Sequence, residues 1–119
     1  MIREKEVEHH LIAAVRKRGG LCLKFVSPGW AGAPDRIVLF PGGRILFVEV
    51  KRPGNKPRAL QRRRMDQLER RGFDSVVVDS KEAVDDLMRS VGVWGGDPLR
   101  KEDGADPGGG GDNEEMPSC

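Results

Sequence analysis

Apolar residues at three- and four-residue intervals mark three helices along this chain. The intervals predict amphipathic helices over residues 4–18, 58–71 and 81–91. Gly19 and Gly72 stand where the first two patterns stop, as glycine does just past a helix end. Ser80 stands at the N-cap position of the third. Four runs of strand-forming residues complete the pattern and predict strands, over residues 21–26, 37–40, 45–48 and 75–78.

The loop between the second and third strands fixes how these two strands pair. Residues 37–40 and 45–48 flank the segment Pro41-Gly42-Gly43. A three-residue loop with a glycine in the left-handed conformation is a common hairpin connection. With this loop Phe40 faces Arg44, and the numbers of facing residues sum to 84. A two-residue loop would turn the side chains of one strand to the opposite face.

This register brings three charged side chains together. Asp35 faces Glu49 with their Cβ atoms about 5 Å apart, and Lys51 lies on the same face two residues further on. Two carboxylates at this distance repel each other unless a proton or a cation lies between them. Mg²⁺ takes oxygen ligands from one or two carboxylates and keeps waters that serve substrate phosphates. The three residues therefore predict a site for metal-assisted phosphodiester hydrolysis, in which Lys51 orients the attacking water or neutralises phosphoryl charge.

Two further polar residues are candidates for the same site. Glu8 heads the apolar stripe of the first predicted helix, so its carboxylate either reaches the metal or ends the stripe at the solvent edge. Glu4 and Glu6 compete with it for that role, and spacing alone does not decide among the three. Gln61 lies on the inward side of the second predicted helix. Its amide either binds a water or a phosphate near the site or faces solvent.

Charge is distributed unevenly along the 119 residues. Residues 1–92 hold 19 Lys and Arg against 12 Asp and Glu, a net charge of +7, whereas residues 93–119 hold 2 against 7. This division predicts a basic domain over 1–92 and a disordered acidic tail, rich in Gly and Pro, over 93–119. The tail either solubilises the chain or competes for the basic surface.

A basic segment of the domain predicts contacts with a phosphate backbone. Eight Lys and Arg residues lie between positions 52 and 71. Such density brings affinity for nucleic acid without reading its sequence. Trp30, in the loop before Asp35, either stacks on an unpaired base or packs on the domain edge. The expected nucleic-acid contacts, besides Trp30, are Arg52, Lys56, Arg58, Arg62 and Arg63.

Composition excludes several other classes of protein. No apolar run approaches the roughly 20 residues that span a bilayer, and the charged N-terminus lacks the apolar stretch of a signal peptide. Cys22 and Cys119 do not resemble a disulfide framework, and no Cys/His cluster predicts structural zinc. We therefore expect a cytoplasmic protein with no membrane partner.

Taken in order, these residues resemble the VRR-NUC (virus-type replication-repair nuclease) family of the PD-(D/E)xK superfamily. The resemblance covers about residues 3–90. It implies an α/β fold, with a restriction-endonuclease-like core and a mixed four-stranded sheet flanked by helices in the order αβββαβα. The residues that carry it are Glu8, Ser27-Pro28-Gly29, Gly32-Ala33-Pro34-Asp35-Arg36, Phe47-Val48-Glu49-Val50-Lys51, Lys56-Pro57 and Gln61.

The resemblance also implies an activity. It implies hydrolysis of DNA phosphodiester bonds that depends on Mg²⁺ or Mn²⁺, with Asp35, Glu49 and the backbone carbonyl of Val50 as metal ligands. Lys51 would be the catalytic lysine. Glu8 and Gln61 would take the remaining two catalytic positions, and Glu8 would also be a further candidate metal ligand. Stand-alone members resemble homodimeric endonucleases that act on branched DNA, including four-way junctions, in replication, repair or recombination.

Two other functions remain open at this stage. A non-catalytic basic nucleic-acid-binding domain would bind in a salt-sensitive way that removing metal leaves unchanged. A nuclease for RNA is the second, because no feature of the sequence distinguishes a 2′-hydroxyl.

Overall fold

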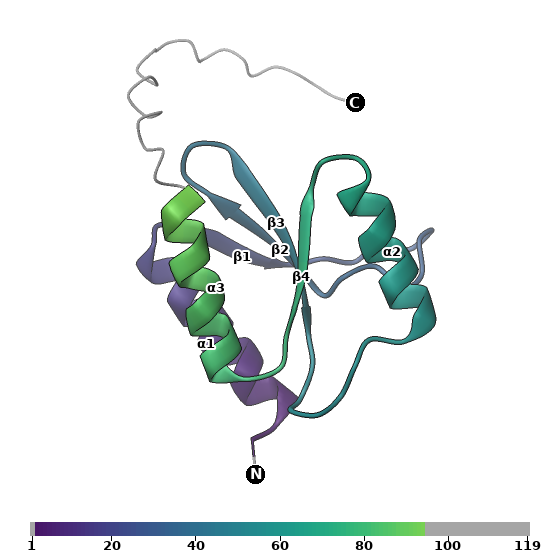
Figure 1. Cartoon of the computed structure of the whole chain (residues 1–119), viewed down its shortest axis with the longest axis horizontal. Helices are drawn as coiled ribbons and strands as arrows, with labels where there is room; N and C mark the ends of the chain where they lie inside the picture. The colour runs from purple at the N-terminus through teal and green to yellow at the C-terminus, as the bar shows by residue number, and fades with distance from the viewer. Residues whose placement is uncertain (1, 95–119) are drawn as a thin grey trace.

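A mixed four-stranded sheet with three helices forms the part of the chain that the computed structural model describes, residues 2–94 (Figure 1). The fold is α/β, and the predicted order of elements is confirmed. None of the helices in this range is long and apolar enough to cross a membrane. The elements are α1 (Glu4–Lys17), β1 (Leu21–Lys24), β2 (Arg36–Phe40), β3 (Arg44–Val50), α2 (Ala59–Glu69), β4 (Asp74–Val78) and α3 (Lys81–Trp94).

The strands lie in the order β1-β2-β3-β4, so chain neighbours are also sheet neighbours until α2 intervenes. β1, β2 and β3 are antiparallel, whereas β3 and β4 are parallel because α2 carries the chain back across the sheet. The predicted hairpin register is confirmed, since the β2–β3 ladder runs from Arg36 with Val48 to Phe40 with Arg44. Gly43 has φ +85°, the left-handed conformation that the loop requires.

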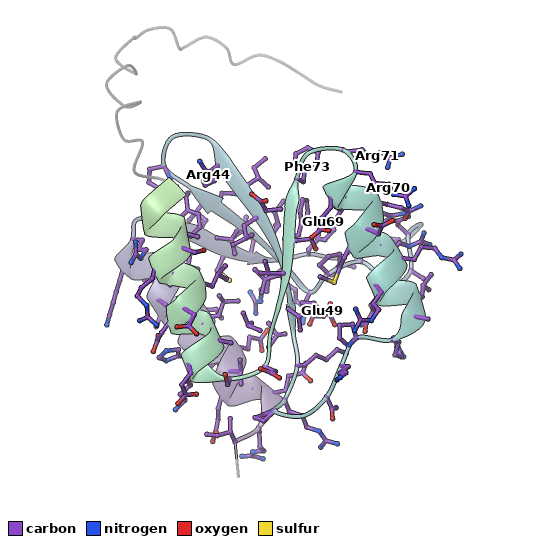
Figure 2. The ribbon with its side chains drawn as sticks, viewed as in Figure 1. Arg44, Glu49, Glu69, Arg70, Arg71 and Phe73 are labelled. Carbon is purple, nitrogen blue, oxygen red and sulfur yellow. The ribbon has the colours of Figure 1, made fainter. Side chains whose placement is uncertain are left out.

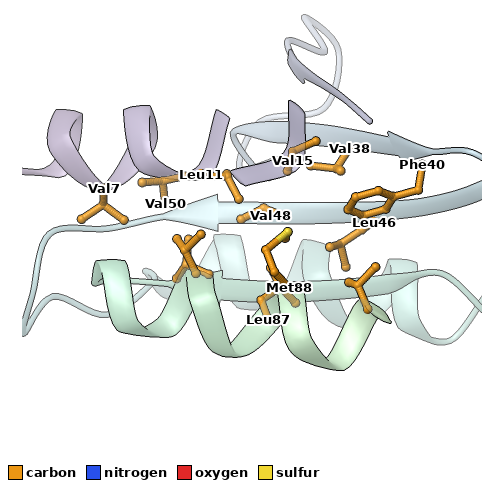
Figure 3. Packing of buried hydrophobic residues seen from close by; sticks show 13 residues of the cluster. Val7, Leu11, Val15, Val38, Phe40, Leu46, Val48, Val50, Leu87 and Met88 are labelled. Carbon is orange, nitrogen blue, oxygen red and sulfur yellow. The ribbon is translucent and has the colours of Figure 1, made fainter. Parts of the chain in front are cut away.

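The core lies on one face of the sheet, where α1 and α3 pack side by side (Figure 3). α1 buries Val7, Leu11 and Val15 at four-residue intervals, and α3 adds Leu87 and Met88 among others. The strands contribute alternate residues to this cluster, as the two-residue period of a strand requires. These strand residues are Val38, Phe40, Leu46, Val48, Val50 and Val78.

The opposite face of the sheet meets α2, which packs mainly against β4. The residues between those of the core therefore point toward α2, and Glu49 and Ser75 are buried there. The half of this face formed by β1 and β2 is left open, and Leu21 and Leu23 on β1 are 57% and 44% exposed. Their ladder partners are Leu39 and Ile37.

Several predicted bounds differ from the structure by one to three residues. The first strand ends at Lys24 rather than at residue 26. The Phe25 N–H still donates a hydrogen bond to the Asp35 carbonyl at 2.8 Å, but the paired residues of the two strands end at Lys24 and Arg36. The third helix continues to Trp94, past the predicted end at residue 91. The acidic tail predicted for 93–119 thus begins inside a helix, and its remainder lies outside the described residues. The Ser80 cap is confirmed, since Ser80 Oγ accepts a bond from the Ala83 N–H at 3.0 Å.

Candidate active site

The start of β2 and the end of β3 hold the two predicted carboxylates side by side. The last ladder pair lies one residue inside these positions, so Asp35 stands next to Glu49. The Asp35 carboxylate accepts a hydrogen bond from the Val50 N–H, with Oδ2 3.1 Å from the nitrogen. Its backbone carbonyl accepts the bond from Phe25. Asp35 is therefore held by both neighbouring strands.

Glu49 is the most buried charged residue of the site, with 1% of its surface exposed, and lies between the sheet and α2 (Figure 2). Its Oε2 accepts a hydrogen bond from Gln61 Nε2 at 2.8 Å and lies 3.3 Å from Lys51 Nζ. The other oxygen, Oε1, is buried without a hydrogen-bond partner within residues 2–94. Because an unpaired buried oxygen costs free energy, Oε1 marks a place for a proton or a cation.

The raised pKa of Glu49 also indicates a place for a proton or a cation. Burial raises the pKa of the Glu49 carboxyl above its ordinary value, and the neighbouring charge of Asp35 raises it further. The hydrogen bond and the charge of Lys51 lower the pKa, as does a hydrogen bond from the Asp35 backbone, but together they do not cancel the effect of burial. A carboxylate pair in this condition is stabilised by any positive charge that enters between them.

Gln61 joins α2 to the site. It is 8% exposed, and while its Nε2 donates to Glu49, its Oε1 accepts a bond from the Arg58 N–H at 2.8 Å. The same amide thus pairs a backbone donor at the start of α2 and orients the buried carboxylate. Of the two alternatives for this residue, the structure supports the inward position.

Glu8 has a different partner from the one expected. α1 covers the core face of the sheet, where Glu8 Oε2 accepts two hydrogen bonds from Arg36, from Nη2 at 2.6 Å and from Nε at 3.1 Å. Arg36 Nη1 also donates to the Cys22 carbonyl at 3.3 Å. Glu4 and Glu6 are exposed, so Glu8 is the member of the three that faces the sheet. Its role as a metal ligand stays a prediction.

The predicted nucleic-acid contacts lie along α2 and the segment that leads to it. All five basic side chains are exposed, and none forms an ion pair within the described part of the chain. They are therefore available to phosphate oxygens. These residues are Arg52, Lys56, Arg58, Arg62 and Arg63.

Trp30 is half-buried and packs against α2. The Arg64 guanidinium carbon lies 5.1 Å from the centroid of the Trp30 ring, within cation–π range. Arg64 Nε also donates to the Ala31 carbonyl at 2.7 Å. Of the two alternatives for Trp30, the structure therefore shows packing at the domain edge.

Sequence reasoning missed two arginines, Arg36 and Arg64. A signal for the first was available: strand alternation places Arg36 on the core face with Val38 and Phe40, where a cation needs an acidic partner. For Arg64 no comparable signal existed, because its partners belong to a loop whose path depends on tertiary packing.

The donor set fits a hard divalent cation. No group of three or more His, Cys, Asp or Glu side chains between residues 2 and 94 has the geometry to hold a metal. Two carboxylates remain, with Glu49 Oε1 lacking a partner. One or two carboxylates completed by water and substrate oxygens are what Mg²⁺ uses in proteins, so the pair suits Mg²⁺ and the chemically similar Mn²⁺.

Fold and site together define an α/β domain with a pair of carboxylates beside a lysine. The VRR-NUC domain family matches residues 3–82 of the chain. The chain is also 49% identical over 82 residues to "Putative nuclease p44" of Acyrthosiphon pisum secondary endosymbiont phage 1, covering 69% of this chain and 88% of the phage protein. The chain therefore belongs to the VRR-NUC domain family.

A solved structure supports the same assignment. It is described as a VRR_NUC domain, is 34% identical in sequence and superimposes with a TM-score of 0.70. The match covers 75% of this chain and 97% of the other. The fold expected from the resemblance is thus confirmed by a solved structure that the match covers almost completely.

Proposed function

We propose that this protein is an endonuclease that hydrolyses DNA phosphodiester bonds with Mg²⁺, for which Mn²⁺ can substitute, and that it acts on branched DNA in replication, repair or recombination. The observation that carries the proposal is Glu49, a buried carboxylate with one unpaired oxygen beside Asp35 and Lys51. A domain that only binds nucleic acid gains nothing from this arrangement, which costs folding free energy. Membership of the VRR-NUC family and the phage relative described as a nuclease support it.

The residues of the site have separate tasks in this proposal. Asp35, Glu49 and the Val50 carbonyl hold the cation, and Gln61 orients Glu49. The cation, when bound, supplies a Lewis acid and lowers the pKa of a bound water. Lys51 lies beside Glu49 Oε2 with most of its side chain covered, so its ammonium group orients the attacking water or neutralises charge on phosphoryl oxygens.

The substrate enters over α2 in this proposal. Its exposed arginines bind the phosphate backbone on the side of the sheet where the carboxylate pair lies, which places a bond near the cation. Trp30, at the edge of α2, stacks on a base that a branch point leaves unpaired, once it leaves Arg64. Glu8 joins the site as a ligand if it exchanges Arg36 for the cation.

Cleavage assays with metal titration test the proposal. A four-way junction, a linear duplex, single-stranded DNA and RNA are incubated with increasing Mg²⁺ or Mn²⁺, using the wild type, Asp35→Ala and Lys51→Ala. We expect the wild type alone to cut, with the junction cut fastest and RNA slowest. In a gel-shift assay Asp35→Ala should bind DNA at least as well, because repulsion is removed. If no substrate is cut by the wild type, or if both variants cut as the wild type does, the proposed activity is wrong.

A homodimer is part of the proposal. One small domain with one site covers little of a junction, whereas a two-fold pair places two sites on opposed strands. A second copy has a surface to occupy on the open half of the sheet, where Leu21 and Leu23 are exposed on the edge strand β1. The half-buried apolar residues beside them are Ile37, Leu39 and Ile45.

Sedimentation tests the dimer. The wild type should sediment as a dimer at micromolar concentration, and Leu23→Lys as a monomer that still nicks duplex DNA but no longer cuts both strands of a junction. A wild type that is monomeric at working concentration and still resolves junctions would overturn this part of the proposal alone.

A further inference from the structure

Two residues one turn apart on α2 contact the two halves of the carboxylate pair by different routes. Gln61 holds Glu49 directly. Arg64, three residues later and therefore on the same side of the helix, holds the loop that leads into Asp35. Arg64 Nε donates a hydrogen bond to the Ala31 carbonyl, and the guanidinium group lies over the Trp30 ring. Arg64 Nη1 also donates to Gln67 Oε1 on the same helix at 3.0 Å, which holds the guanidinium group in place.

The backbone of the loop at Gly32 lies against side chains of α2. Gly32 has φ +87°, and a Cβ added there would lie 2.8 Å from Leu60 Cγ and 3.4 Å from Arg64 Cγ. Only glycine accepts both the conformation and the close approach. The backbone of the loop therefore lies directly on α2, and three residues later the chain reaches Asp35.

We propose that Arg64 is a positioning residue for Asp35. By fixing residues 30–32 on α2, it sets the direction in which the chain enters β2, so that the Asp35 carboxylate meets Glu49. One helix then holds both carboxylates, Glu49 through Gln61 and Asp35 through Arg64. The inference rests on the proposed function, since the ligand that detects the arrangement is the divalent cation proposed there.

The sign of the effect separates positioning from simple electrostatics. Arg64 is positively charged, so if it acted only through its charge, removing it would make a cation bind more tightly. If it positions Asp35, removing it loosens a ligand and makes the cation bind more weakly. Loss of an outer-shell partner commonly weakens metal binding by about 10- to 100-fold, and we expect about tenfold because Arg64 acts through the loop backbone.

The experiment measures Mn²⁺ binding to the full chain by calorimetry, without DNA and without cleavage. The variants are Arg64→Met, which keeps the aliphatic stem, and Arg64→Lys, which keeps the charge and one donor. Arg70→Met is the matched control, because Arg70 is exposed at the far end of the same helix and pairs there with Asp66 (Figure 2). All carry Trp94→Phe, which leaves Trp30 as the one tryptophan of the chain and its emission as the signal for release of the loop.

We expect Arg64→Met to shift the Trp30 emission to longer wavelength and to weaken Mn²⁺ binding about tenfold, with Arg64→Lys in between and Arg70→Met equal to the wild type or tighter. Gly32→Ala, which pushes the loop off α2 without removing charge, should reproduce the weakening if Arg64→Met unfolds. Equal or tighter binding by folded Arg64→Met, or an unchanged Trp30 emission, overturns the inference. If the wild type binds no Mn²⁺, the proposed function fails first, and the two failures are thereby distinguished.

Discussion

Replacing Gln61 with methionine tests whether the amide orients the buried carboxylate. The change removes the bond that Gln61 Nε2 donates to Glu49 and the bond that its Oε1 accepts from the Arg58 N–H. A hydrogen bond to a charged group contributes about 1.5–3 kcal/mol and an ordinary one about 1 kcal/mol. The apolar atoms of methionine return about 1 kcal/mol. Unfolding free energy should therefore fall by about 2 kcal/mol, with the larger part coming from Glu49.

Two assays detect this loss. A domain of this size loses about 4–8 °C of melting temperature per kcal/mol, so Gln61→Met should melt about 10 °C below the wild type in EDTA at pH 8. Because Glu49 is then free to rotate away from Asp35, Mn²⁺ affinity should fall about 10- to 100-fold. Calorimetry measures both quantities on the same protein.

Acid provides an internal control for the same variant. The hydrogen bond that Gln61 donates is stronger to a charged Glu49 than to a protonated one. The difference in melting temperature between the wild type and Gln61→Met should therefore become smaller once Glu49 is protonated. The part of the difference that comes from the bond between the Arg58 N–H and Gln61 should remain. A Gln61→Met protein that melts within about 2 °C of the wild type at pH 8 and binds Mn²⁺ equally well would refute the reasoning.

Three other predictions follow from burial and charge. The raised pKa of Glu49 means that the folded protein binds this proton more tightly than the unfolded chain. Stability without metal should therefore fall as pH rises from the ordinary glutamate value through the raised one, and pH-dependent melts of Glu49→Gln should lack this component. Arg62→Ala should weaken DNA binding for all sequences and reduce the slope of log K against log salt by about 1, measured by fluorescence anisotropy. Leu11→Ala, fully buried in α1, should cost about 2–5 kcal/mol in urea unfolding.

The sequence was sufficient for the hairpin because its loop is local. Three residues with glycine at the left-handed position allow one register, and that register alone places Asp35 beside Glu49. The inward direction of Gln61 could be anticipated as one of two alternatives. Its bond to Glu49 could not be anticipated, because it depends on how α2, which connects β3 to the parallel strand β4, packs on the face of the sheet, and neighbouring residues do not determine that packing.

Other parts of the site were hidden for a different physical reason. The burial of Glu49 to 1% exposure follows from α2 covering its face, and its unpaired Oε1 follows from that burial. Sequence spacing indicated repulsion between two carboxylates but not that one of them would lie beyond the reach of water. The contacts of Arg64 with Trp30 and Ala31 were inaccessible in the same way, since a loop has no periodicity that assigns its residues to a face.

Strand alternation at the start of β2 gives adjacent residues opposite tasks. Asp35 points to the face of α2 and the proposed cation, whereas Arg36 points to the core face and binds Glu8 on α1. The peptide unit between them is thus held from both sides of the sheet. Both bonds from Arg36 go to Oε2 of Glu8, so a cation could take the place of Arg36 at this oxygen only by breaking a half-buried pairing with two donors. Glu8 therefore supports, through Arg36, the backbone that carries Asp35, and a role for its Oε2 as a ligand must begin by breaking that support.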